Sequence, residues 1–474
     1  MPEIQTTITP HNQQPYVQRT YPTESELDAV IQSAAEAQKA WSKVPLEERV
    51  EIGRKFIEEF KNMANEIPLE LTMQMGRPVS QGAGEIRGLV ERAEYMLSIA
   101  SKSLADVALT DTDKPGFRRF IKRTPLGVIL IIAPWNFPYL TSINVLLPAL
   151  LAGNAVLLKP SPQTPLTASR LALALTRAGV PLDVIQVLHM SPKLTEHVVQ
   201  HPQVSFVSFT GSVGGGRAVA RAAVEGPGFM GVGLELGGKD PAYVREDADL
   251  GYTVAELVDG AYFNSGQSCC AIERIYVHES LYDEFVQRFV DIVKTYKLGD
   301  PTLPSTTLGP VVSLASAARI RKQIADAVAA GAKKLIPEDL FSIAKEGTTY
   351  VAPQVLVDVD HSMEIMKAKT FGPVVGIQKV SSDTEALHLM NDSPYGLTAS
   401  IWTNAHHNPE SESAFLGLVD GLETGTVFLN RCDYLDPALA WTGVKDSGRG
   451  VSLSRFGYDQ LTRAKSVHMK IKTS

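Results

Sequence analysis

Short apolar runs alternate with helical segments between residues 128 and 209, and this alternation constrains the fold more than any other feature. Four runs are predicted to be strands, at residues 128–133, 155–159, 184–188 and 204–209. A continuous apolar run is typical of a parallel strand that is buried on both faces. The pattern therefore predicts a doubly wound α/β sheet. A similar alternation after residue 231 predicts a second α/β layer.

Length and composition exclude several classes of protein. A chain of 474 residues is expected to form two or three domains. The net charge of −7 argues against a nucleic acid or a membrane surface as partner. The longest apolar run, residues 126–134, is too short to cross a bilayer. Residues 1–14 do not resemble a secretory signal, and three cysteines make no disulfide framework. We therefore expect a reducing, cytoplasmic location.

The segments outside the two layers are predicted to cover or extend them. Residues 1–24 are expected to form an irregular arm, and Ser25 is the expected N-cap of the first of three helices. The third helix spans about 84–104, and none of the three shows any chemistry. Residues 117–123 alternate apolar and basic side chains, which predicts a half-exposed strand that is either solvated or an edge covered by another subunit. The final segment, 464–472, is predicted to pair with it.

Ligands of doubly wound sheets bind beyond the carboxyl ends of the strands, so the residues there are candidates for function. The glycine-rich residues 211–216 join a strand to a helix, whose N-terminus favours a pyrophosphate, although the spacing alone is a weak signal. Lys159 either contacts a phosphate or ribose or is an edge lysine that reaches solvent. Asn136 either donates its amide to an oxyanion or caps a helix.

A thiol and a carboxylate are the candidate reactive groups. Residues 263–270 contain glycine and look like a loop, and they hold two of the three cysteines. Cys269 is therefore either an activated nucleophile or a small buried hydrophobic residue. Glu235 lies among apolar and glycine residues. Desolvation of its charged form is expected to raise its pKa toward the range of a general base.

Six motifs occur in a fixed order with matching gaps. They are Pro-Trp-Asn-Phe-Pro at 134–138, Phe-Thr-Gly-Ser at 209–212, Glu-Leu-Gly-Gly-Lys at 235–239, Gly-Gln-Ser-Cys at 266–269, Phe-Gly-Pro at 371–373 and Ser-Gly-Arg-Gly at 447–450. Together they resemble the NAD(P)-dependent aldehyde dehydrogenase superfamily, from about residue 25 to the C-terminus. The resemblance implies three parts and a homodimer or homotetramer. These parts are a Rossmann-type cofactor-binding domain (1–106 and 126–236), an α/β catalytic domain (237–445) and a small β oligomerisation arm (107–125 and 460–474).

The resemblance also implies a mechanism for oxidising an aldehyde to its carboxylic acid. Cys269 would attack the aldehyde, and the Asn136 side chain and the Cys269 backbone N–H would hold the oxyanion. Hydride transfer to nicotinamide would leave a thioester, which water activated by Glu235 would release. Cys270 would only line the pocket.

The implied cofactor is NAD or NADP, lying over the first sheet. Lys159 and Ser161 would meet the adenosine ribose, Ser212 the pyrophosphate and Trp135 the nicotinamide side. The complete set is Trp135, Lys159, Ser161, Pro162, Gly211, Ser212, Gly216, Leu236, Lys369 and Phe371.

Two of these residues depart from the family pattern. Pro162 stands where many NAD-preferring members carry a glutamate that repels a 2′-phosphate, so we expect NADP to be accepted. Lys369 stands where the family usually has a glutamate for the nicotinamide ribose. A cation cannot accept those hydrogen bonds, so Lys369→Glu is expected to raise turnover.

The substrate pocket carried over from the family is partly polar. It comprises Phe137, Leu140, Thr141, Asn144, Phe263, Ser268, Cys270, Arg431 and Asp433. A small polar aldehyde or semialdehyde is therefore favoured, and aromatic aldehydes remain open. Arg431 either pairs with a substrate carboxylate or with Asp433. No metal site is expected.

Two other functions compete with this interpretation. One is a nicotinamide-independent hydrolase or acyltransferase that uses Cys269 with a histidine such as His278. The other is a non-catalytic or cofactor-impaired member of the fold, which Lys369 makes worth testing. A CoA-acylating dehydrogenase is a nearer alternative, but Glu235 favours water as the acyl acceptor.

Overall fold

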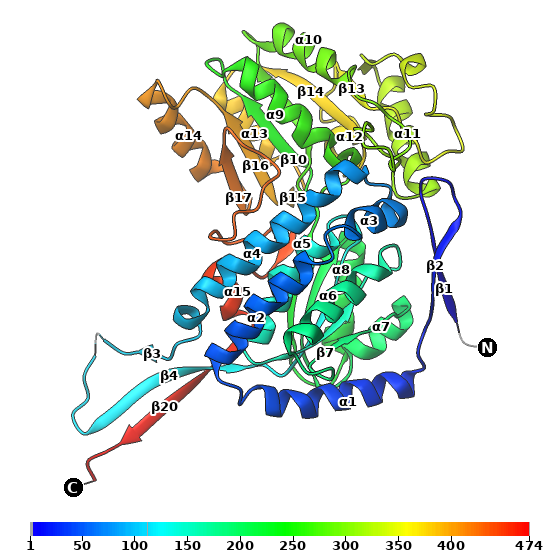
Figure 1. Cartoon of the computed structure of the whole chain (residues 1–474). Coiled ribbons are helices and arrows are strands. Elements are labelled where there is room, and N and C mark those ends of the chain that lie inside the picture. Colours follow the sequence, from blue (N-terminus) through cyan, green and yellow to red (C-terminus); the bar gives the residue numbers. More distant parts are fainter. Residues whose placement is uncertain (1–2, 111, 474) are drawn as a thin grey trace.

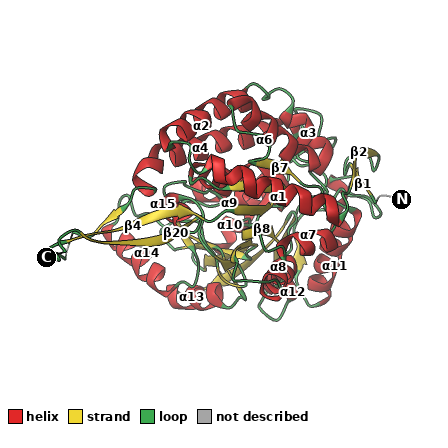
Figure 2. Ribbon diagram, turned by 90° about the horizontal axis from the view of Figure 1, so that it is seen from below, coloured by secondary structure: helices red, strands yellow, loops and turns green. Residues whose placement is uncertain are grey.

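The computed structural model describes residues 3–110 and 112–473. Two open α/β sheets form the body of the molecule, and a narrow β-ribbon projects from it (Figures 1 and 2). The predicted α/β fold with its Rossmann-like sheet is therefore confirmed. Within these residues, no helix combines the length and the apolar character needed to cross a membrane.

The first sheet has the strand order β19-β9-β8-β5-β6-β7, and all neighbours are parallel except β19 and β9. Its strands are β5 (Val128–Ile132), β6 (Ala155–Lys159), β7 (Ile185–Val187), β8 (Val204–Gly211), β9 (Gly231–Leu236) and β19 (Gly448–Arg449). The chain adds β6 and β7 on one side of β5 and then β8 and β9 on the other. A ligand crevice forms where the strand order reverses in this way, beyond the carboxyl ends of the strands.

Helices cover both faces of the first sheet. One face packs against α2 (Leu46–Lys61), α4 (Gly82–Ser103), α5 (Pro138–Leu151) and α6 (Pro165–Ala178). The other packs against α1 (Glu24–Trp41), α7 (Pro192–Val199) and α8 (Val213–Glu225). Two short helices, α3 (Ile67–Met75) and α15 (Ser454–Asp459), also pack on the first face.

The N-cap predicted for the first helix is wrong. Thr23, rather than Ser25, caps α1, because its hydroxyl accepts the Glu26 N–H while the Glu26 carboxylate accepts the Thr23 N–H. This reciprocal pair is a capping box, which satisfies two backbone donors at once.

The second sheet has the strand order β12-β13-β14-β11-β10-β16-β17. Its strands are β10 (Asp240–Val244), β11 (Ile272–His278), β12 (Lys333–Lys334), β13 (Gln354–Val357), β14 (Val374–Val380), β16 (Thr398–Trp402) and β17 (Thr426–Leu429). The helices beside it are α9 (Leu250–Tyr262), α10 (Tyr282–Val293), α11 (Leu314–Ala329), α12 (Glu364–Lys367), α13 (Asp383–Asn391) and α14 (Pro409–Gly421). The second α/β layer is confirmed, although the sequence did not indicate β16, α13 or α14.

The predicted domain boundary between residues 236 and 237 falls between β9 and β10, which belong to different sheets. Near the C-terminus the chain returns to the first sheet through β19 and α15. The segment predicted to be a loop from 431 to 445 ends in β18 (Val444–Lys445), which pairs with β15 (Tyr395–Gly396). The division into domains stays a prediction.

Residues 3–24 are not the irregular arm that was predicted for residues 1–24, and residues 1–2 lie outside the described part of the chain. They contain an antiparallel hairpin of β1 (Ile4–Ile8) and β2 (Pro15–Thr20). Gln5 Nε2 and Thr7 Oγ1 donate to the Pro162 carbonyl oxygen over 2.7 and 2.8 Å. These bonds hold the hairpin against the loop that follows β6.

The projecting ribbon consists of β4 (Phe117–Pro125), β20 (Thr462–Lys470) and β3 (Val107–Ala108), in the order β20-β4-β3 (Figure 1). The predicted pairing of the C-terminal segment with the basic strand is confirmed along the full length of both strands. The edge-strand interpretation of residues 117–123 holds in part, because among the described residues β3 pairs only with Phe120 and Ile121. Coverage of this edge by another subunit stays a prediction. Four exposed apolar residues lie on or beside this ribbon: Val107, Leu109, Met469 and Ile471.

Candidate active site

A strained turn carries the candidate thiol from α9 to β11. The turn, η2 (Phe263–Gly266), has positive φ values at Asn264 (51°), Ser265 (57°) and Gly266 (68°). A Cβ atom on Gly266 would lie 2.2 Å from the Gly372 carbonyl oxygen. Glycine is therefore required at this position, both for its conformation and for the close approach of two backbones.

The two adjacent cysteines lie in different environments. Cys269 is half-buried and lines a cavity, whereas Cys270 is buried and its Sγ donates to Asp433 Oδ1 over 2.9 Å. The hydrogen bond with Cys269, burial and the Asp433 carboxylate raise the pKa of the Cys270 thiol well above its ordinary value. Burial also raises the pKa of Cys432. A thiol must ionise to act as a nucleophile, so these environments favour Cys269 over Cys270 and Cys432.

Asn136 follows β5 and reaches the thiol loop. Its side-chain Nδ2 donates to the Gln267 backbone carbonyl oxygen over 3.1 Å, and the Asn136 backbone carbonyl oxygen accepts a hydrogen bond from Arg77. The interpretation as a helix cap is wrong, because α5 has Phe137 at its N-cap, without a side-chain cap hydrogen bond. An amide nitrogen carries two hydrogens, so Asn136 keeps one for a ligand.

A buried ion pair supports this arrangement. Arg77 pairs with Glu85, and both side chains are buried. The Glu85 carboxylate also accepts the Tyr139 N–H over 2.9 Å, which satisfies a backbone donor in the first turn of α5. The start of α5 and the Asn136 backbone are therefore fixed together.

Glu235 projects from β9 toward the same cavity. Ser452 Oγ donates to its Oε1, and Thr210 Oγ1 donates to its Oε2 over 3.4 Å. Burial raises the pKa of Glu235, while Ser452, Arg92 and Thr210 oppose the rise. The raised pKa expected from the sequence is confirmed.

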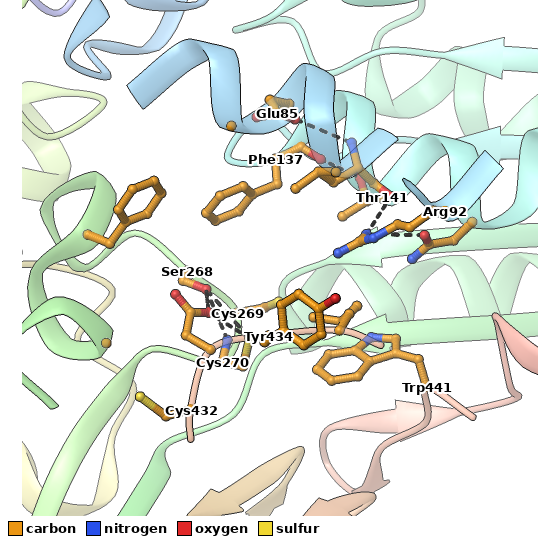
Figure 3. A pocket seen from close by; sticks show the side chains of 18 of the residues that line it. Glu85, Arg92, Phe137, Thr141, Ser268, Cys269, Cys270, Cys432, Tyr434 and Trp441 are labelled. Carbon is orange, nitrogen blue, oxygen red and sulfur yellow. Dashed lines mark hydrogen bonds between the residues drawn. The ribbon is translucent and has the colours of Figure 1, made fainter. Parts of the chain in front are cut away.

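Cys269 and Glu235 line one cavity of about 370 Å³, which Figure 3 shows from close by. Of the predicted pocket residues, eight lie on its wall: Phe137, Leu140, Thr141, Asn144, Phe263, Ser268, Cys270 and Asp433.

Arg431 is the exception among the predicted pocket residues. Its guanidinium carbon lies 3.5 Å from the centroid of the Tyr434 ring. Asp433 instead accepts from Ser268 Oγ over 2.8 Å. Both interpretations of Arg431 are therefore wrong: it neither lines the cavity nor pairs with Asp433.

Helix α4, predicted to carry no chemistry, forms one wall of the cavity. Arg92 donates through Nη1 to the Leu140 carbonyl oxygen over 2.8 Å and to Asn144 Oδ1 over 3.1 Å. A signal for Arg92 was present in the sequence, because Glu85 and Arg92 are seven residues apart on the face that buries Leu89. Sequence reasoning also missed several other residues on the wall: Arg77, Glu85, Arg87, Glu91, Glu256, Asp259 and Trp441.

The predicted cofactor residues gather at the carboxyl ends of the first sheet. Lys159 is 7% exposed and bonds to the Pro160 carbonyl oxygen over 3.3 Å. Burial lowers its pKa to about 8. The edge-lysine interpretation is wrong, since β6 lies between β5 and β7. Among the described residues Lys159 has no acidic partner, which fits a ligand that supplies the hydrogen-bond acceptors.

The glycine-rich turn after β8 opens helix α8. Ser212 is its N-cap, and its Oγ accepts the Gly215 N–H over 3.1 Å. Cβ atoms on Gly211 and Gly215 would meet the Phe209 ring at 2.7 and 2.6 Å. Next to this turn, a Cβ atom on Gly216 would lie 2.7 Å from Leu236. Backbone N–H groups at such a helix start suit a pyrophosphate, so these residues fit the implied dinucleotide.

The remaining predicted cofactor residues lie near the thiol loop or near the hairpin. Trp135 and Phe371 pack edge to face, with centroids 5.5 Å apart. Lys369 Nζ donates to the carbonyl oxygens of Gly238 and Cys269. Ser161 Oγ accepts the Gln163 N–H over 3.2 Å. The Pro162 carbonyl oxygen accepts a hydrogen bond from Gln5 of the N-terminal hairpin.

Comparisons with known proteins agree with this geometry. A model of the Aldehyde dehydrogenase family matches residues 2–467. The chain belongs to the aldehyde dehydrogenase family. Succinate-semialdehyde dehydrogenase (NADP+) of Mycobacterium avium is 35% identical over 405 residues, which cover 85% of this chain and 83% of that protein.

Two solved structures of the family are also similar. NADP-dependent glyceraldehyde-3-phosphate dehydrogenase from Bacillus halodurans, complexed with NADP, is 30% identical with a TM-score of 0.91, covering 99% of this chain and 96% of that one. Betaine aldehyde dehydrogenase from Staphylococcus aureus, in complex with NAD+, is 27% identical with a TM-score of 0.91, covering 100% and 92%. The activity of this chain is therefore the oxidation of aldehydes with NAD or NADP, by the family's cysteine mechanism.

The rival interpretation as a cysteine–histidine hydrolase is wrong. His278 ends β11 and bonds through Nδ1 to Ser280 over 2.8 Å, and it lies outside the cavity wall.

Proposed function

We propose that this aldehyde dehydrogenase releases its product by hydrolysis, with water rather than CoA as the acyl acceptor. The observation that carries this proposal is that the Glu235 carboxylate and the Cys269 thiol line the same cavity. Desolvation raises the pKa of Glu235, which suits a general base near neutral pH.

In the proposed first step, Cys269 Sγ bonds to the aldehyde carbon, and the carbonyl oxygen becomes an oxyanion. The second amide hydrogen of Asn136 and the Cys269 backbone N–H stabilise this charge. Bound NAD(P)+ supplies the acceptor for the hydride that leaves the carbon. The product on the protein is a thioester of Cys269.

In the second step, Glu235 removes a proton from a water molecule, whose oxygen bonds to the thioester carbon. The carbon–sulfur bond then breaks, and the carboxylic acid and the Cys269 thiolate are released. Ser452 and Thr210 hold the Glu235 carboxylate in place through their hydroxyl groups.

For the dinucleotide, we propose that Lys159 and Ser161 meet the adenosine ribose and that Ser212 and the start of α8 meet the pyrophosphate. The unpaired, buried ammonium of Lys159 supports this assignment. Gly211, Gly216 and Leu236 would line the groove, and Trp135, Lys369 and Phe371 its nicotinamide end. Pro162 offers no carboxylate to repel a 2′-phosphate, so NADP is accepted.

We also propose that the chain forms a homodimer or homotetramer in the cytoplasm. Exposed Val107, Leu109, Met469 and Ile471 on the projecting ribbon support a covered surface, since exposed apolar patches mark interaction sites. Three free cysteines suit a reducing compartment.

Steady-state assays of nicotinamide reduction with a panel of small polar aldehydes test this function. We expect turnover with NADP, the free acid as product, and no increase in rate when CoA is added. A thioester of CoA as the main product would overturn the hydrolytic assignment. Pro162→Glu should shift the preference toward NAD by about tenfold, whereas the uncharged control Pro162→Gln should not.

A further inference from the structure

Arg92 is a buried cation that faces the substrate cavity without an anionic partner. It is 7% exposed, and within the described residues only its Nη1 forms hydrogen bonds, to Leu140 and Asn144. Among the described residues, no carboxylate lies within ion-pair distance of its guanidinium. Buried arginines are almost always paired, because an unpaired buried charge costs several kilocalories per mole. The Nε and Nη2 groups of Arg92 are therefore available to donate hydrogen bonds to a ligand.

A second unpartnered donor lies beside Arg92. Asn144 is 1% exposed, and its Nδ2 has no hydrogen-bond partner in the described part of the chain, although the residue lines the cavity. Its Oδ1 is fixed by Arg92, so the amide nitrogen is oriented. Figure 3 shows the guanidinium directed into the space between Thr141 and Trp441, with Cys269 on the far side in this view. Arg92 and Asn144 thus form a pair of donors on the wall made by α4 and α5, which we term the α4–α5 donor cluster. The Thr141 hydroxyl beside them already donates to the Phe137 carbonyl oxygen over 2.9 Å.

The acidic residues of the cavity do not neutralise this cluster. Glu256 and Asp259 come from α9, and Asp433 is occupied by Ser268 and Cys270. On α4, Glu85 pairs with Arg77, and Glu91 accepts a hydrogen bond from the Tyr434 hydroxyl. Glu235 attracts Arg92 electrostatically but bonds to Ser452 and Thr210 instead. An anion in this cavity is therefore drawn to the α4–α5 side and repelled from the α9 side.

We propose that the α4–α5 donor cluster binds the carboxylate of an aldehyde acid, with Arg92 as the residue that determines specificity. The preferred substrates are then short aldehydes that carry a carboxylate at the far end from the reacting carbon. A guanidinium binds a carboxylate through paired N–H donors, which an apolar aldehyde leaves unsatisfied. This proposal rests on the proposed function and identifies its substrate class.

Three aldehydes distinguish the chemistry that Arg92 recognises: succinic semialdehyde with a carboxylate, glyceraldehyde with hydroxyl groups, and apolar butanal. We expect kcat/KM for succinic semialdehyde to exceed that for butanal by about 10- to 100-fold, the worth of a charge-assisted hydrogen bond. Arg92→Gln should remove this ratio, and Arg92→Lys should keep part of it. A ratio measured within each variant cancels any loss of folded protein. Arg54→Gln, at an exposed arginine side chain of α2, is the matched surface control.

Binding of succinate and of its uncharged diamide, succinamide, measured by calorimetry on wild-type protein and Arg92→Gln, gives a readout that needs no turnover. We expect succinate to bind about tenfold or more tightly than succinamide, and this difference to vanish in Arg92→Gln. Succinate selectivity in a protein that oxidises no aldehyde would contradict the proposed function and support the carboxylate subsite. Equal binding of succinate and succinamide, or a preference for glyceraldehyde that Arg92→Gln removes, would overturn the carboxylate proposal.

Discussion

The ammonium group of Lys369 donates a hydrogen bond to the backbone carbonyl oxygen of Cys269 over 3.0 Å. The same group donates to the Gly238 carbonyl oxygen and lies 3.8 Å from Glu273 Oε1. Glu273 in turn accepts the backbone N–H groups of Thr370 and Phe371. Lys369 therefore joins the segment around Phe371 to the loop of the candidate nucleophile.

Because of these contacts, we now expect Lys369→Glu to lower turnover rather than raise it. A glutamate would place a carboxylate beside two carbonyl oxygens and near Glu273, so we predict a loss of order in the Cys269 loop. Loss of a charge-assisted hydrogen bond is expected to lower kcat about 10- to 100-fold. The rate of alkylation of Cys269 by iodoacetamide reports the loop without any cofactor, and it should change as well.

Lys367→Glu is the matched control, because Lys367 is an exposed neighbour that pairs with Asp392. If Lys369→Glu raises turnover and leaves alkylation unchanged, the ribose expectation holds and the positioning role of Lys369 is refuted.

The pH dependence of acyl-enzyme hydrolysis should follow Glu235. A base acts when ionised, so the rate rises with pH through the raised pKa of this residue. Ser452 Oγ stabilises the carboxylate form, and Ser452→Ala should therefore move the acidic limb up by about one pH unit. The acidic limb of the pH–rate profile is measured by single-turnover hydrolysis, after Cys269 has been acylated with an activated ester. Glu235→Gln should abolish it, and an unshifted limb in Ser452→Ala would contradict the assignment.

Asp433 should reduce the stability of the fold at neutral pH. Burial raises its pKa from 3.8 to about 6, so the folded state holds the proton longer than the unfolded state. The contribution of the Asp433 carboxyl to the free energy of unfolding therefore falls as the pH rises from 3.8 to about 6. Asparagine keeps the acceptor for Ser268 and Cys270 and tolerates the positive φ of 48°.

Denaturant unfolding of wild-type protein and Asp433→Asn tests this sign. The free energy of unfolding of Asp433→Asn, measured relative to wild-type protein, should increase by about 3 kcal/mol across that pH range, at about 1.4 kcal/mol per pKa unit. An advantage that is constant with pH would show that Asp433 is not the titrating group.

The projecting ribbon should mediate assembly. Met469 and Ile471 are 38% and 60% exposed on or just beyond β20, so replacing both by glutamate should dissociate the oligomer. Sedimentation velocity measures the change in mass. Leu182→Glu, at a 70% exposed leucine outside the ribbon, is the control. A wild-type monomer, or an unchanged mass in the double variant, would refute the role.

The sequence was sufficient where local pattern decides the structure. The apolar runs of β5, β6 and β8 are buried on both faces, and their carboxyl ends carry Asn136, Lys159 and Ser212 as expected. Glu235 was identifiable because its apolar and glycine neighbours in the sequence predict that its carboxylate is desolvated.

The sequence was insufficient where a contact between distant segments decides the structure. The N-terminal hairpin depends on Pro162, more than 150 positions away, and its own residues have no apolar face. Arg92 and Lys369 are single charges whose direction is fixed by Leu140 and by the Cys269 carbonyl oxygen. The helical spacing of Glu85 and Arg92 places Arg92 on the inner face of α4, but it does not encode the groups to which Arg92 and Lys369 bond.

The identity of the acylated residue tests the role of Cys269 most directly. Glu235→Gln should form the thioester but not hydrolyse it, so incubation with aldehyde and NADP+ should yield one reduced nicotinamide per active site. Peptide mapping by mass spectrometry should then find the acyl group on Cys269. An acyl group on Cys270, or repeated turnover by a Cys269→Ala variant, would contradict the mechanism.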